Sequence, residues 1–197
     1  AAAVSTLHAA GAPPVPRAAS FQRWARDQSF APVLGASLTR APRVDLSLDS
    51  PLTLEGGRER PFSAWAAEIE ARRVASGAPA AVGFHDEARR LYQTDSFTEA
   101  REDGEEPRTV HLGVDLFAPE GTEVFAPLAA RVLSVQRNPA PLDYGPTVIL
   151  EHEGEDGRPF FTLYGHLDEG VLQRLHPGDA LAPGDTGSSS SSASTAV

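Results

Sequence analysis

The sequence predicts a mainly β protein, with an antiparallel β-sheet or sandwich in its C-terminal half and a mixed α/β connector region before it. After residue 109, short apolar runs recur between Gly and Pro turns, at a spacing typical of antiparallel strands. No helical pattern separates these runs, whereas helical and extended patterns are mixed before residue 108. The expected strands cover residues 110–117, 123–126, 130–135, 147–151 and 160–164.

The region 1–108 is expected to be a connector or N-terminal subdomain, and its clearest element is a helix over residues 61–76. Pro61 suits the first helical turn, where its missing N–H would have no partner in any case. Trp65 and Ile69 are four residues apart and therefore share a face of this helix. That face is most simply a packing surface, and no residue cluster in this region indicates chemistry.

Two stretches of unusual composition predict the domain boundaries. Residues 99–108 are highly charged and contain Gly and Pro, which predicts an exposed linker. Residues 188–197 begin with a serine run that cannot bury apolar area, which predicts a disordered tail. We therefore expect one folded β domain over residues 109–187. Because the sequence does not begin with methionine, we expect a processed chain or a fragment.

Composition excludes several classes of function. The 197 residues carry a formal net charge of -10, which argues against binding nucleic acid through its phosphates. Cysteine is absent, so disulfides, thiolate zinc sites and cysteine nucleophiles are excluded, and any metal must be held by His, Asp or Glu. No run approaches the roughly 20 apolar residues that cross a bilayer, and no signal peptide is recognisable. Together these absences slightly favour a cytoplasmic protein.

The segment HLGVD, from His111 to Asp115, is the first candidate site. An imidazole and a carboxylate suit zinc, which binds nitrogen and oxygen ligands at about 2 Å. In an extended strand their α-carbons would lie roughly 13 Å apart, and Gly113 permits the bend that brings them together. The same spacing is also that of a surface histidine and a turn aspartate, which is the commoner case.

Three further histidines lie in the β half. His166, in YGHL at the end of an apolar strand, is placed to act as a general acid, a base or an oxyanion donor. A structural histidine satisfied by backbone groups is the alternative. His152 is expected to be structural or exposed, and His176 to be solvated in a turn.

Taken together, these segments resemble the lysostaphin-type zinc metallopeptidases. HLGVDLFAPEGTEVFAP, ARVLSV, DYGPTVILEH, FFTLYGHL and PGDALAPGD follow one another in that family's order, over about residues 109–187. The resemblance implies a mostly antiparallel core called the duplicated hybrid motif, and hydrolysis of short peptide bridges, often in peptidoglycan. It also implies that His111 and Asp115 bind Zn²⁺, which activates the attacking water. His166 would then be a catalytic residue that polarises the scissile carbonyl or stabilises the developing oxyanion.

The sequence departs from this family at one point. The family pattern ends in a His-x-His pair that supplies the third zinc ligand and a second catalytic histidine, and no such pair occurs here. Catalytic zinc sites normally keep three protein ligands plus water. We therefore expect a truncated or frameshifted copy, in which zinc binding is weak or absent and peptidase activity is lost.

Two alternatives remain open. The region before residue 110 contains FAPVLGASL, VDLSLDSP and GFHDEARRLYQTDSF, which leads into RTVHLGVDLFAP. With these segments it resembles the connector of multidomain proteins that carry this module between a kinase-like domain and a class III aminotransferase. In that setting the domain would be a non-catalytic structural or binding module, whose partners are neighbouring domains and not a peptide substrate. The fold is also shared by phosphocarrier domains of sugar transport, and there His166 would accept the phosphoryl group. This last alternative leaves the spacing of His111 and Asp115 unexplained.

Overall fold

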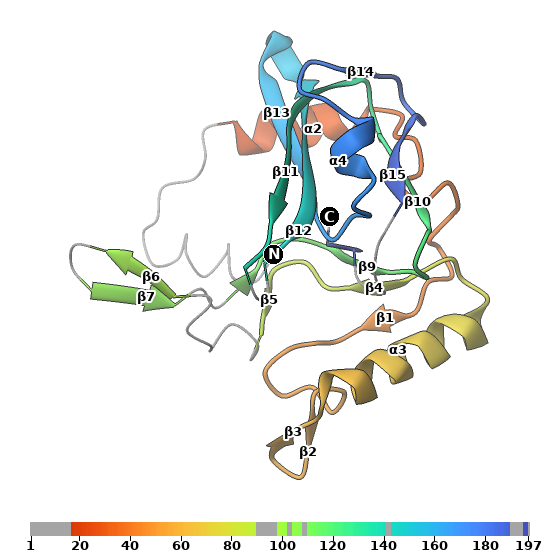
Figure 1. The fold of residues 1–197 in the computed structure, drawn as a ribbon, viewed down its shortest axis with the longest axis vertical. Helices are drawn as coiled ribbons and strands as arrows, with labels where there is room; N and C mark the ends of the chain where they lie inside the picture. Colours follow the sequence, from red (N-terminus) through yellow and green to blue (C-terminus); the bar gives the residue numbers. More distant parts are fainter. Residues whose placement is uncertain are drawn as a thin grey trace.

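The structure, a computed structural model, describes residues 17–89, 98–101, 104–107, 110–140, 143–189 and 195–196. Strands dominate it and most strand pairs are antiparallel, which confirms the predicted mainly β class. In Figure 1 a tall, curled sheet stands above a second sheet, and the longest helix lies beneath that second sheet. Within the described ranges, no helix is both long enough and apolar enough to cross a membrane.

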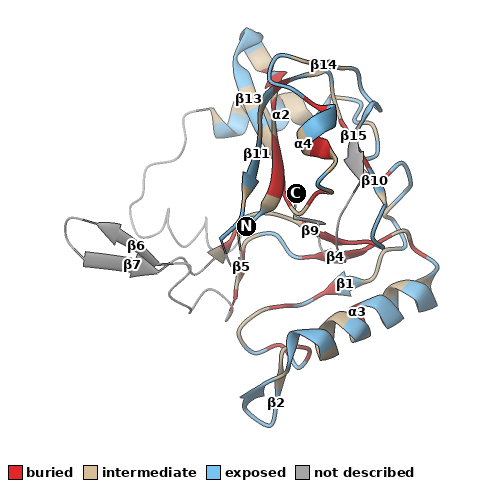
Figure 2. Ribbon diagram, in the orientation of Figure 1, coloured by how far each residue is buried: buried red, intermediate tan, exposed pale blue. Residues whose placement is uncertain are grey.

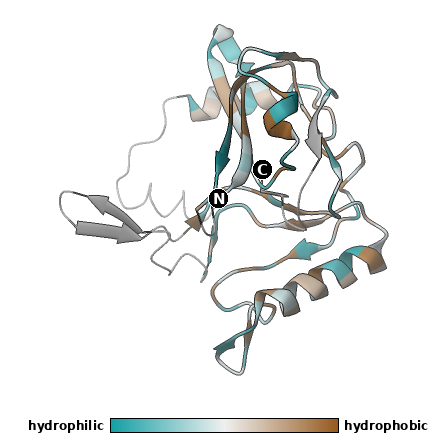
Figure 3. Cartoon of the chain, viewed as in Figure 1, coloured by the Kyte–Doolittle hydropathy of each residue, from teal (hydrophilic) through white to brown (hydrophobic). Residues whose placement is uncertain are grey.

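The tall sheet has the strand order β13-β12-β11-β14, with every pair antiparallel. A bulge between Val132 and Ser134 interrupts the register, and bulges of this kind bend the strand and increase its twist. The sheet curls around helix α4 (Figure 1), whose first residues are coloured as hydrophobic in Figure 3. The bounds are Ala130–Asn138 for β11, Gly145–Glu153 for β12, Pro159–Tyr164 for β13, Ala180–Leu181 for β14 and Val171–Arg174 for α4.

A hydrophobic cluster fills the inside of this curl (Figure 2). Val132 and Val148 face inward from the sheet, and Val171 of α4 meets them with no exposed surface. Burying a side chain of this size stabilises the fold by about 1.5–3 kcal/mol. Leu34 and Ala80, which precede the predicted β domain, belong to the same cluster. The N-terminal region therefore packs into the core of the β domain.

The second sheet joins both halves of the chain. Its order is β1-β4-β9-β16, in which β4 pairs in parallel with β1 and antiparallel with β9. The sheet crosses the predicted boundary between residues 108 and 109, which lie outside the described residues, so the division into domains stays a prediction. The bounds are Arg43–Val44 for β1, Ala81–Gly83 for β4, Asp115–Phe117 for β9 and Thr195–Ala196 for β16.

Helix α3 (Phe62–Ser76) packs against this second sheet and confirms the helix predicted over residues 61–76. Pro61 stands at the N-cap, and Gly77 ends the helix in the left-handed conformation, at a φ of 66° that glycine adopts without strain. The cluster between helix and sheet contains Val44, Leu46, Leu52, Ile69, Ala81 and Phe117, with Trp65 against it.

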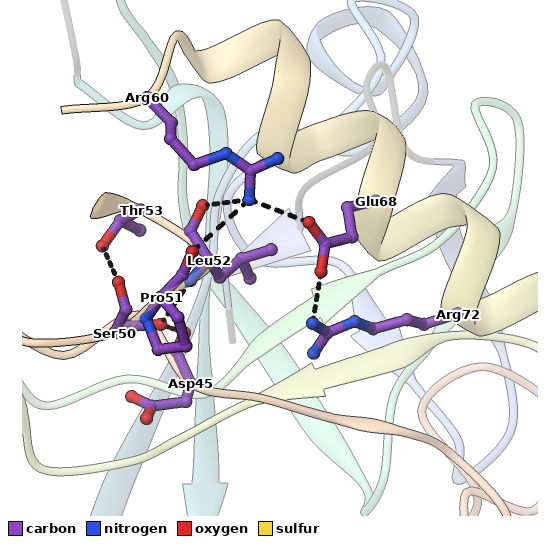
Figure 4. Close-up of polar contacts among 8 residues, drawn as sticks. All are labelled: Asp45, Ser50, Pro51, Leu52, Thr53, Arg60, Glu68 and Arg72. Atoms are coloured by element: carbon purple, nitrogen blue, oxygen red, sulfur yellow. Dashed lines mark hydrogen bonds and ion pairs between the residues drawn. The ribbon is translucent and has the colours of Figure 1, made fainter. Parts of the chain in front are cut away.

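Polar contacts tie the start of α3 to the loop that follows β1 (Figure 4). The Arg60 guanidinium donates to the carbonyl of Leu52 at 2.9 Å and to Oε2 of Glu68 at 2.8 Å, and Glu68 also pairs with Arg72. Ser50 donates to the carbonyl of Asp45 at 2.6 Å. The segment between Leu52 and Arg60 forms the hairpin of β2 (Leu54–Glu55) and β3 (Arg58–Glu59).

The predicted strands are found with two kinds of difference. The strand expected over 110–117 is split into β8 (Val110–His111) and β9, because residues 112–114 leave the ladder. Strand β11 runs three residues beyond its predicted C-terminal end, and β12 is two residues longer than predicted at each end. β10 (Glu123–Phe125) and β13 lie where they are predicted.

Two segments expected to lack regular structure contain strands. The predicted linker over residues 99–108 includes a hairpin of β6 (Thr98–Arg101) and β7 (Gly104–Pro107). Its charged composition does not prevent pairing, since a ladder is made by the backbone. In the tail predicted over residues 188–197, β16 pairs with β9. β15 (Thr186–Ser189), which pairs with β10, begins in the predicted β domain and ends in the predicted tail. Residues 190–194 and 197 lie outside the described residues.

Helix α2 (Ala18–Arg26) is held on the far side of the tall sheet by an aromatic cluster. Phe21 and Trp24 meet the ring of Phe160 with centroids 5.0 and 5.5 Å apart, in edge-to-face geometry. Ser20 donates to Oε1 of Glu155 at 2.6 Å, in the 3-10 turn Glu155–Gly157. The two residues are 135 positions apart in the sequence.

We expect Ile69→Ala to lower the free energy of unfolding by about 2–5 kcal/mol, because it opens a cavity between α3 and the second sheet. Ile69 is 2% exposed. Val74→Ala on the same helix is the control: Val74 is 61% exposed, and the change should stay within about 0.5 kcal/mol. Urea denaturation measures both, and equal losses would contradict the described packing of α3.

Candidate functional site

His111 and Asp115 lie side by side. Nε2 of His111 is 3.6 Å from Oδ1 of Asp115, and the two residues are 8% and 4% exposed. The cause is local, since the interruption of the ladder at residues 112–114 shortens the path that a continuous strand would impose. The bend that the sequence predicts at Gly113 therefore occurs.

Two charged residues from the N-terminal region reach this pair. Arg89 Nη1 lies 2.6 Å from Oδ2 of Asp115, and Arg89 Nε donates to Oε2 of Glu87 at 2.8 Å. Glu87 stands opposite His111 in the pairing of β5 (Glu87–Ala88) with β8. Burial raises the pKa of Glu87, against the opposing effects of Arg89 and of the Leu46 N–H.

Glu87 and Arg89 were not predicted from the sequence, because no residue cluster before residue 109 indicates chemistry. A weak signal was present: His85, Glu87 and Arg89 alternate and so share one face of an extended segment. Nothing in the sequence indicates that this face meets His111, because the two segments are paired only through long-range strand contacts.

The surroundings of His111 favour its neutral ring. Burial lowers the pKa of His111, since a charged imidazole loses its hydration there, and the positive charge of Arg89 acts in the same direction. The carboxylate of Asp115 opposes them, as does a hydrogen bond with the Phe84 backbone. A neutral imidazole is the form that binds a metal ion.

His166 follows β13 in the left-handed conformation, with a φ of 54°. Its backbone N–H donates to the carbonyl of Tyr144 at 2.6 Å, and Leu167 N–H donates to the carbonyl of Pro146 at 3.1 Å. These bonds extend the pairing of β12 and β13 past the end of the sheet. Burial lowers the pKa of His166, while Asp115 and Asp143 oppose the shift. The negative charges of Asp115 and Asp143 favour the protonated ring, and burial outweighs them.

The other two histidines of the β half have structural surroundings. His152 is 2% exposed, with Nδ1 3.0 Å from the carbonyl oxygen of Ala129 and Nε2 2.8 Å from Oγ1 of Thr162. Its ring stacks on Phe160 at 4.8 Å. His176 is exposed in a turn, where its backbone N–H donates to Oδ2 of Asp179.

The His111–Asp115 pair fits one edge of a zinc site. Two ligand atoms at about 2.0–2.1 Å from a tetrahedral ion lie about 3.4 Å from each other. The 3.6 Å between Nε2 and Oδ1 is close to this value. Across the described ranges, however, no group of three or more His, Asp, Glu or Cys side chains could hold a metal ion. The described residues therefore offer an incomplete set of ligands.

Two comparisons with known proteins found a match. Residues 109–196 match peptidase family M23, so this part of the chain is a peptidase M23 domain, and the resemblance to lysostaphin-type peptidases is confirmed there. The crystal structure of a zinc-containing peptidase from Vibrio cholerae is similar, with 18% identity and a TM-score of 0.38 over 57% of this chain. The match covers 34% of that chain, so the present chain corresponds to about a third of its length. No curated protein matches.

We expect the His152→Gln variant to lose less stability on acidification than the wild type. Burial holds the pKa of His152 below its ordinary 6.5, so the unfolded chain takes up a proton first as the pH falls. Above pH 6.5 the neutral His152 ring makes its full contribution to the free energy of unfolding. As the pH falls from 6.5 toward the pKa of the folded state, that contribution is lost at up to about 1.4 kcal/mol per pH unit.

Urea unfolding of the wild type and His152→Gln, each at about pH 8 and about pH 5.5, checks this expectation. The measurement at the higher pH gives the cost of the substitution itself, because the ring is neutral in both states there. The wild type should then lose more stability than the variant on acidification. Equal losses would show that His152 does not contribute to the pH dependence.

Proposed function

We propose that residues 109–187 act as a zinc-binding domain of the peptidase type, with His111 and Asp115 as metal ligands and His166 as the catalytic residue. The observation that best supports this proposal is the 3.6 Å separation of Nε2 and Oδ1 within the segment that matches peptidase family M23. When bound, zinc supplies the Lewis acidity that activates water for attack on a peptide carbonyl.

In a complete site of this kind, His166 would handle the proton. Its lowered pKa favours an uncharged ring at neutral pH, and such a ring can accept a proton from water and later return it to the leaving amine. The 2.6 Å hydrogen bond from its N–H to the Tyr144 carbonyl supports a fixed backbone at this position. Asp115 would contribute electrostatically as well, since its charge favours the protonated form of His166.

We further propose that this chain binds zinc weakly and hydrolyses no peptide bond. Catalytic zinc sites normally use three protein ligands, and the His-x-His segment that would complete this set is absent from the sequence. Short peptides of the peptidoglycan type remain the substrate class that we propose for a complete site of this kind.

A second candidate function is a non-catalytic structural or binding module whose partners are neighbouring domains. The observation that favours it is the shared sheet, in which β4 from the N-terminal region lies between β1 and β9. A module of this kind requires no third ligand. In either case we propose that nucleic acid is not a partner, because the net charge of -10 repels phosphate.

Zinc stoichiometry and affinity distinguish the two candidates. For a metal-binding domain we expect about one zinc ion per chain, with an affinity at least about tenfold lower in His111→Ala and in Asp115→Asn. His176→Ala is the matched control, because this exposed histidine pairs with Asp179 in a turn and should leave zinc binding unchanged.

Equal zinc binding by the wild type and His111→Ala would contradict the proposed ligands and favour the non-catalytic module. A peptide hydrolysis assay on the same samples tests the proposed loss of activity. Hydrolysis that requires zinc and disappears in His166→Ala would show that the chain is an active peptidase after all.

A further inference from the structure

Three buried charged residues form an ion triad that includes one of the two candidate metal ligands. The triad consists of Glu87, Arg89 and Asp115, which are 6%, 8% and 4% exposed. Arg89 is its centre, with Nε 2.8 Å from Oε2 of Glu87 and Nη1 2.6 Å from Oδ2 of Asp115. The proposed function uses Asp115 but assigns no role to Arg89.

A buried carboxylate such as that of Asp115 needs a compensating charge. Moving an ionised group out of water is costly, and a partner charge with good hydrogen-bond geometry offsets that cost. In a metalloprotein the metal ion is one source of this charge. Here Arg89 supplies it, and a guanidinium stays charged throughout the physiological pH range. The carboxylate of Asp115 is therefore compensated on its Oδ2 side by the protein itself.

The surroundings of Arg89 also fix how the Asp115 carboxylate is turned. The second oxygen of Glu87 accepts the N–H of Leu46 at 2.8 Å, so the anchor of the guanidinium is itself held by the backbone. On β4, a Cβ on Gly83 would stand 3.1 Å from Cβ and 3.2 Å from Oδ2 of Asp115. With Oδ2 held by Arg89 and backbone close behind it, Oδ1 remains directed toward Nε2 of His111.

We infer that Arg89 is a positioning residue, the built-in counter-charge of Asp115, and that it assembles the His111–Asp115 pair in the absence of metal. The inference rests on the proposed function for the use of this pair as ligands. The compensation of charge itself requires no zinc, which makes the two ideas separately testable.

A double-mutant cycle in the presence of EDTA tests this role. Arg89→Met keeps the length of the side chain and removes its charge, and we expect the melting temperature to fall by about 10 °C. Adding Asp115→Asn to that variant removes one of the two carboxylate charges that it leaves without their partner, so the double variant should melt several degrees higher than Arg89→Met alone. Arg131→Met, at an exposed arginine of β11, is the matched control and should melt within about 2 °C of the wild type.

The sign of the coupling decides the outcome. If Arg89 only fills space, the decreases in melting temperature of the two single variants add up in the double variant. A double variant that melts below both single variants therefore overturns the inference. An unchanged melting temperature in Arg89→Met also overturns it. If Arg89→Met does not fold, recovery of a folded double variant supports the inference, and failure to recover overturns it.

The zinc experiment remains independent of this cycle. Stabilising coupling in EDTA without any zinc binding would support the role of Arg89 and contradict the proposed metal function. Zinc binding that depends on His111, together with additive losses in the cycle, would support the proposed metal function and contradict the role of Arg89.

Discussion

The position of strand β4 is the constraint on which the rest of the structure depends. It pairs with β1 on one side and with β9 on the other, so it holds the N-terminal region and the β domain in one sheet. One consequence is that α3 has an apolar surface on which to pack. The other is that the residues after β4 run directly past His111 and Asp115, where β5 pairs with β8.

This arrangement links the stability of the fold to the chemistry of the candidate site. Asp115 lies within the sheet as the first residue of β9, and its carboxylate is buried beside Gly83 of β4. A carboxylate at that depth must be compensated, and Arg89 provides the compensation from a segment that the sheet itself delivers. The electrostatics of the candidate ligands therefore depend on residues outside the peptidase M23 match, which begins at residue 109.

The two candidate functions share this electrostatic framework and differ in what completes it. A peptidase needs further ligands and a proton carrier, the role that we propose for His166. A non-catalytic module needs only the fold, and in it the ion triad would be a structural feature. The ion triad stabilises the metal-free state in both cases, so a well-folded apoprotein is compatible with either function.

Local patterns in the sequence were enough to predict many elements. The helix over residues 61–76 is confirmed because Pro61, the apolar face and Gly77 all act within a few residues of one another. The strands from β10 to β13 are confirmed because alternation and turn residues are local too. The proximity of His111 and Asp115 belongs to the same class, since one break in a strand produces it.

The tertiary structure alone decided which distant segments meet. Neither the parallel pairing of β1 and β4 nor the approach of Glu87 and Arg89 to the candidate ligands has a local signal, because a two- or three-residue strand carries too little pattern to specify its partner. The sequence by itself therefore determined the mainly β class, the principal helix and the candidate ligand pair. The counter-charge of Asp115 was decided by long-range pairing, since burial and charge compensation arise only when separate segments are brought together.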